Sequence, residues 1–171
     1  GNASLVFDFT ATSFGLNLGT ATSTLSAGTI DLRTTSGFFG NGAGSTTLAI
    51  SSGAQLLAST ASNTRSLSGL TLNNSGTVQA NSFGLAGTTT SVVNNQAGGR
   101  IHASGAEVNF QSGSTLTNAG TLRATGSAGV LRFNNAIPTA NLGTVDLVSG
   151  AHAYFASSST LTNTGQTLAV P

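Results

Sequence analysis

Residues 116–124 read Leu-Thr-Asn-Ala-Gly-Thr-Leu-Arg-Ala, and this stretch decides the fold. An Asn and a Gly, both residues that favour turns, separate two short segments in which apolar and polar residues alternate. Alternation with a period of two is typical of a β-strand that buries one face. The stretch therefore predicts two short strands joined by a tight turn.

The same pattern recurs along the chain at a nearly constant interval. Each copy carries an apolar anchor, and the last five anchors lie 23, 21, 23 and 23 residues apart. The seven anchors are Ile30, Leu56, Val78, Ile101, Leu122, Val145 and Leu168. A further alternating triplet follows most anchors, as in Leu131-Arg-Phe133, so that each repeat holds three short strands. One such repeat cannot bury its apolar face alone, but stacked repeats form a continuous core.

We therefore predict an all-β fold, namely a right-handed parallel β-helix (a β-solenoid) with three short strands per coil. The spacing gives about seven or eight coils of ~22 residues each. Residues 1–171 form a single β-solenoid domain in this interpretation. Residues 1–25 make the first coil or N-terminal cap region, and residues 26–171 make the regular repeats.

An Asn precedes the anchor in most copies. Equivalent side chains of stacked coils lie directly above one another, and an amide can both donate and accept hydrogen bonds. Asn also tolerates the left-handed backbone conformation that tight turns require. We predict a structural ladder of five residues: Asn74, Asn95, Asn118, Asn141 and Asn163.

Charged residues are scarce, at 5% of the 171 positions, and the five basic residues are all Arg. Ser, Thr, Asn and Gly supply the polar surface, and these residues are poor helix formers. A hydrophobic fraction of 38% with a net charge of +1 argues against disorder. Five dispersed arginines give no basic stripe for nucleic acid. No apolar run is long enough to predict a membrane span.

The pattern apolar-x-Asn-x-Gly-x-apolar-x-Ala in residues 116–124 resembles the repeats of filamentous-haemagglutinin-like exoproteins. It is also similar to autotransporter passenger domains, and the resemblance covers roughly residues 22–171. It implies a right-handed parallel β-helix, export by Gram-negative bacteria, and a role in adhesion, surface fibres or biofilm matrix. The absence of Met and Lys likewise favours a secreted, extracellular chain at the cell surface.

Candidate catalytic groups are few and dispersed. Glycoside hydrolysis requires two carboxylates within about 10 Å of each other. The predicted coils separate the four acidic residues, which are Asp8, Asp31, Glu107 and Asp146. The two histidines, His102 and His152, fall on different strands, so a shared metal is not expected. We predict a protein that is not an enzyme, with no catalytic residue, no cofactor and no metal site.

Two outward columns of side chains follow from the repeat. The first contains Asp31, Leu57, Gln79, His102, Arg123, Asp146 and Ala169. Arg123 and Asp146 are neighbours in it, which predicts an ion pair. The second column contains Gly84, Asn109, Arg132 and Tyr154, in which Arg132 could stack on Tyr154.

Two functions remain open. The first is a structural subunit that stacks end to end into a surface fibre or biofilm-matrix filament, because unpaired strand edges at solenoid ends favour association. The predicted end-to-end contacts are Leu5, Phe7, Phe9, Leu168 and Val170. The alternative is an adhesin segment of a longer secreted passenger that binds carbohydrate or a host protein. The length of the mature chain in its source separates the two.

Overall fold

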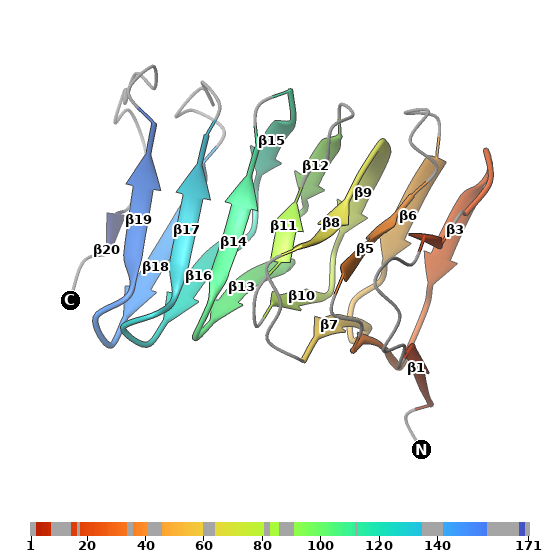
Figure 1. Ribbon diagram of the computed structural model, residues 1–171, viewed down its shortest axis with the longest axis horizontal. Coiled ribbons are helices and arrows are strands. Elements are labelled where there is room, and N and C mark those ends of the chain that lie inside the picture. Colours follow the sequence, from red (N-terminus) through yellow and green to blue (C-terminus); the bar gives the residue numbers. More distant parts are fainter. Residues whose placement is uncertain are drawn as a thin grey trace.

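The computed structural model describes residues 3–7, 15–16, 18–33, 36–40, 46–59, 64–80, 83–85, 91–111, 113–134, 142–156 and 168–169. These residues form strands and turns, and none of them lies in a helix. The chain winds coil by coil along its long axis, so that strands far apart in sequence lie side by side (Figure 1). All pairings between strands are parallel, which confirms the predicted β-solenoid.

Three parallel sheets form the sides of the solenoid. Sheet A runs in the order β1 (Ser4–Phe7), β4 (Thr29–Leu32), β7 (Gln55–Ala58), β10 (Thr77–Ala80), β13 (Arg100–Ser104), β16 (Thr121–Thr125), β18 (Thr144–Val148) and β20 (Leu168–Ala169). Sheet B runs in the order β19 (His152–Phe155), β17 (Val130–Phe133), β14 (Glu107–Phe110), β11 (Phe83–Leu85), β8 (Thr64–Leu67), β5 (Ser36–Phe39) and β2 (Gly15–Leu16). Sheet C runs in the order β15 (Thr115–Asn118), β12 (Val92–Asn95), β9 (Leu70–Asn74), β6 (Thr46–Ile50) and β3 (Thr22–Leu25).

The number of coils differs from the prediction. Five coils have a strand on all three sides among the described residues, because sheet C contributes five strands. Sheet A contributes eight strands, which is the number that the seven or eight predicted coils require. The difference arises in the part of the chain after β15, for which no further sheet C strand is described. Residues 135–141 and 157–167 fall outside the described part of the chain.

The apolar anchors form one column on the inner face of sheet A. The register runs through Leu5, Ile30, Leu56, Val78, Ile101, Leu122, Val145 and Leu168. The five anchors from Leu56 to Val145 are at most 1% exposed, and Ile30 is partly buried. On sheet B, the rings of Phe110, Phe133 and Phe155 stack with centroids 5.1 and 4.8 Å apart. Inward columns of like side chains therefore fill the core.

Three of the predicted asparagines, Asn74, Asn95 and Asn118, lie at the ends of sheet C strands, and their side chains point inward. The side chain of Asn74 donates to Asn95 Oδ1 at 2.7 Å, and that of Asn95 donates to Asn118 Oδ1 at 2.6 Å. Their exposed fractions are 0%, 1% and 5%. Asn141 and Asn163 lie outside the described residues.

None of the three described asparagines, Asn74, Asn95 and Asn118, adopts the left-handed conformation that Asn tolerates at tight turns. Ser149 is the one non-glycine residue with positive φ in the described part of the chain. Each Asn instead remains extended and turns its amide into the core. There Asn118 Oδ1, for example, accepts from the backbone N–H of Gly120 at 3.2 Å.

The Gly of the motif answers a different need, the close approach of neighbouring coils. A Cβ added at Gly99 would lie 2.3 Å from the backbone oxygen of Asn74, and one added at Gly120 would lie 2.2 Å from that of Gly99. No side chain fits at these distances. In the Asn-x-Gly motif, the Asn side chain therefore hydrogen-bonds to the backbone of its own turn. The Gly allows that turn to pack directly on the turn of the previous coil.

Candidate functional site

The outward face of sheet A carries the first predicted column. The register places Asp31, Leu57, Gln79, His102, Arg123, Asp146 and Ala169 in one line. Arg123 Nη1 lies 2.7 Å from Asp146 Oδ2, and both side chains are about one-third exposed, at 32% and 28%. An ion pair of this exposure contributes about 0–1 kcal/mol, so it aids the register of β16 and β18 more than the stability.

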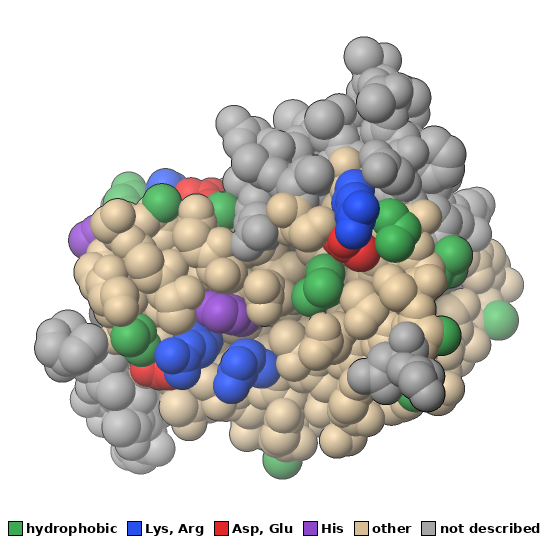
Figure 2. Space-filling view, turned by 90° about the horizontal axis from the view of Figure 1, so that it is seen from below, with side chains coloured by type: hydrophobic (Ala, Val, Ile, Leu, Met, Phe, Trp, Pro, Cys, Tyr) green, Lys and Arg blue, Asp and Glu red, His purple; other side chains and the backbone are tan. Residues whose placement is uncertain are grey.

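Three basic side chains gather on this face, namely Arg100, His102 and Arg123, which we call the sheet A cluster. Arg100 and His102 alternate along β13, and Arg123 is the register partner of His102 on β16. Figure 2 shows positive side chains beside a histidine on one face of the molecule, next to an acidic side chain. The cluster spans two neighbouring coils.

His102 is half-buried within this cluster. Its Nε2 lies 2.9 Å from Thr125 Oγ1, and its Nδ1 is buried with no hydrogen-bond partner among the described residues. Burial lowers the pKa of His102, and the positive charges of Arg100 and Arg123 lower it further, against the opposing charge of Asp146. The imidazole is therefore harder to protonate here than in water.

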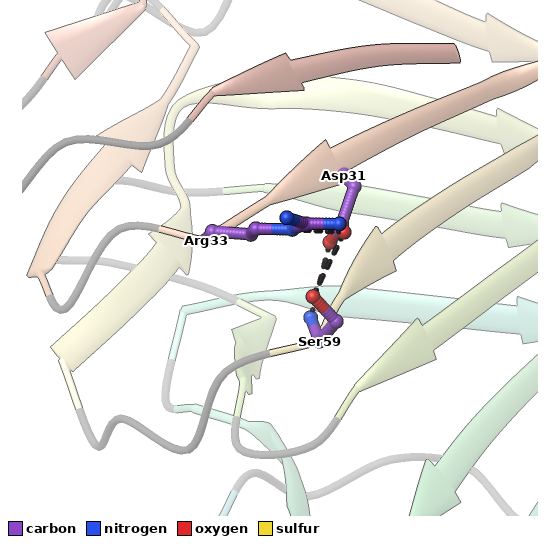
Figure 3. Close-up of polar contacts among 3 residues, drawn as sticks. All are labelled: Asp31, Arg33 and Ser59. Carbon is purple, nitrogen blue, oxygen red and sulfur yellow. Dashed lines mark hydrogen bonds and ion pairs between the residues drawn. The ribbon is translucent and has the colours of Figure 1, made fainter.

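Asp31 lies on the outward face in the register, but it is buried rather than solvated, at 5% exposed. Arg33 Nε donates to its Oδ2 at 2.8 Å, and Ser59 donates through its hydroxyl at 2.8 Å and its backbone N–H at 3.2 Å (Figure 3). Burial raises the pKa of Asp31, but these hydrogen bonds and the charge of Arg33 outweigh it, so the pKa falls below its ordinary value. A sequence signal for this ion pair was available, since Arg33 follows Asp31 by only two residues.

Sheet B carries a second charged group, built on the predicted column of Gly84, Asn109, Arg132 and Tyr154. The guanidinium of Arg132 lies 4.5 Å from the ring centroid of Tyr154, which is 52% exposed. Arg132 Nε also donates to Glu107 Oε2 at 2.7 Å. This ion pair did not follow from the predicted column, because Glu107 lies diagonally from Arg132, two residues before its register partner Asn109.

The arrangement of the acidic groups bears on enzymatic chemistry. Asp31, Glu107 and Asp146 each form an ion pair with a separate arginine, on β4, β14 and β18 respectively. Within the described ranges, no group of three or more His, Cys, Asp or Glu residues could hold a metal ion. His102 lies on sheet A, whereas His152 lies exposed on sheet B. Asp8 lies outside the described part of the chain.

The predicted end contacts are only partly described. Leu5 on β1 is 55% exposed, although it continues the inward anchor column. For Phe7 and Leu168 the backbone is described but not the side chain, and Phe9 and Val170 lie outside the described residues.

Comparisons with protein-family models, with curated proteins and with solved structures found no match to this chain. No helix that is long and apolar enough to cross a membrane occurs among the described residues.

Proposed function

We propose that this chain is a non-enzymatic, secreted structural protein, a β-solenoid that stacks coil on coil into a surface fibre or matrix filament. The observation that carries the proposal is the unbroken register of sheet A from β1 to β20. Each coil adds one residue to the same inward column of anchors. A coil of another molecule that paired in register with an end strand would therefore continue this column. The low content of charged residues supports this role, because the electrostatic repulsion between stacked coils is small.

The end strand β1 supports the same proposal. Among the described strands it pairs on one side only, with β4, and Leu5 and Val6 are 55% and 40% exposed. An exposed apolar edge strand is a template for pairing with another chain. A head-to-tail contact of this kind produces an open filament, unless the rotation between successive molecules closes them into a ring.

Electron microscopy of residues 1–171 at near-neutral pH, with light scattering over a series of concentrations, tests the proposal. We expect unbranched filaments with an axial repeat of about 4.8 Å. Leu5→Lys places a charge on the edge and is expected to abolish filaments. Thr71→Lys, on the outward face of a central strand, is the matched control that leaves them intact. A chain that stays monomeric at every concentration contradicts the proposal.

A further inference from the structure

The sheet A cluster brings two guanidinium groups onto one flat face. Arg100 is exposed at the start of β13. Arg123 lies on the next coil, two residues beyond Thr121, which is the register partner of Arg100. Positions related in this diagonal way are separated by roughly 7–8 Å between their Cα atoms. Long side chains that start at such a separation can reach one small anionic group together.

The positive charge of Arg100 is not balanced by a carboxylate among the described residues. Arg100 forms no ion pair with any of the described residues, whereas Arg123 has Asp146 on the side away from His102. The Nδ1 atom of His102 is buried and has no hydrogen-bond partner among the described residues. Burial lowers the pKa of His102 most, and the charges of Arg100 and Arg123 lower it further.

Neutral hydrogen-bonding side chains border the cluster. In the register of sheet A, Arg100 lies between Thr77 and Thr121, and His102 has Gln79 beside it. The bordering side chains are Thr77, Gln79, Thr121 and Thr125. Such a border suits a ligand whose negative groups lie among hydroxyl groups.

We propose that the sheet A cluster is a binding site for the carboxylate groups of an acidic polysaccharide. The planar guanidinium of arginine matches a carboxylate with two parallel hydrogen bonds, which favours this group over a diffuse charge. Coils repeat about every 4.8 Å along the axis, a spacing similar to the length of one sugar unit in an extended chain. A polysaccharide along the axis would therefore present successive sugars to successive coils.

Nucleic acid is the less favoured polyanion. Its phosphates require a row of cations along the groove, and affinity depends on the number of phosphates that are neutralised. Here the cluster offers two arginines, and one of them already pairs with Asp146, so it provides no such row of cations. The inference goes beyond the structural role, and it does not depend on end-to-end stacking.

Binding of polygalacturonate oligomers, followed by isothermal titration calorimetry at low salt, tests the site. Neutral dextran and single-stranded DNA are the comparison ligands. Arg100→Gln is expected to weaken polygalacturonate binding about tenfold, because it removes a charged hydrogen-bonding group from the site. Arg132→Gln makes the same change on sheet B and is expected to leave the affinity unaltered.

Arg100→Lys keeps the charge but removes the planar fork, so an intermediate loss is expected. Far-UV circular dichroism and thermal unfolding establish that each variant is folded. No binding of polygalacturonate by the wild-type chain overturns the proposal, as does an equal loss with Arg132→Gln. Tighter binding of single-stranded DNA than of polygalacturonate would assign the cluster to nucleic acid instead. Light scattering on the same samples reports end-to-end stacking separately, so failure of one proposal is distinguishable from failure of the other.

Discussion

Replacement of Asn95 by Ala tests the amide ladder directly. Asn95 is 1% exposed, and its amide accepts from Asn74 at 2.7 Å and donates to Asn118 at 2.6 Å. It also donates to two backbone oxygens, that of Gly99 at 3.2 Å and that of Thr121 at 3.3 Å. Asn95 therefore links its own turn to the coils on both sides.

The cost of this replacement follows from the four contacts. A net contribution of about 1 kcal/mol for each short bond and ~0.5 kcal/mol for each longer one gives about 3 kcal/mol. The matched control is Asn94→Ala on the same strand. Asn94 is half-buried and points outward, and it donates to Asn73 Oδ1 at 2.9 Å. Its replacement is expected to cost about 0.5 kcal/mol.

Urea unfolding followed by far-UV circular dichroism measures both variants. Because coils of a solenoid can unfold separately, the slope of the transition has to be compared with that of the wild type before free energies are derived. If Asn95→Ala and Asn94→Ala differ by less than about 0.5 kcal/mol, the inward amides do not stabilise the stack and the reasoning fails.

Three further predictions concern the close-packed turn and the two perturbed ionisable groups. Gly99→Ala should destabilise the fold by more than its neighbour Gly98→Ala in urea unfolding. At Gly98 the cost is left-handed backbone strain of about 1–2 kcal/mol at a φ of 83°, whereas at Gly99 a Cβ would collide with backbone; equal losses would contradict this account. Asp31→Asn should cost about 1–3 kcal/mol at pH 7, since it removes the charge that Arg33 and Ser59 bond. Because the pKa of Asp31 is lowered in the folded state, the cost should vanish as the pH falls below 3.8 and through that lowered pKa; a cost independent of pH would refute the assignment. The lowered pKa of His102 means that the unfolded chain binds this proton more readily, so stability should decline as the pH falls below 6.5. His102→Gln should remove that decline in melting temperature, and an unchanged decline would exclude His102 as its source.

The repeat pattern predicted the registers of sheets A and B because a solenoid converts sequence spacing into spatial neighbours. Once the anchors were aligned, the pairing of Arg123 with Asp146 and of Arg132 with Tyr154 followed by counting. Counting residues predicts which face of the sheet a side chain lies on, but not which other residues cover that side chain. The burial of Asp31 therefore escaped prediction, since it depends on Arg33 and Ser59 beyond the ends of β4 and β7.

The asparagines show a second limit of sequence analysis. Their stacking follows from the period, but their conformation does not. A turn residue was expected to adopt positive φ, whereas glycines such as Gly98 take that role and Asn95 stays in the strand. The alternation of β12 places Asn95 inward, and an inward amide requires partners in the core. The ladder therefore satisfies a burial requirement rather than a turn requirement.

The scarcity of charge has a physical reason in this fold. Side chains at equivalent positions of neighbouring coils stack about 4.8 Å apart, and two like charges at that distance repel by about 1 kcal/mol even in water. The described carboxylates all meet an arginine, which offsets this cost. The sheet A cluster is different, because Arg100 has no carboxylate partner among the described residues. A positive group that the fold does not neutralise is costly for stacking alone, and a bound carboxylate would supply the missing partner.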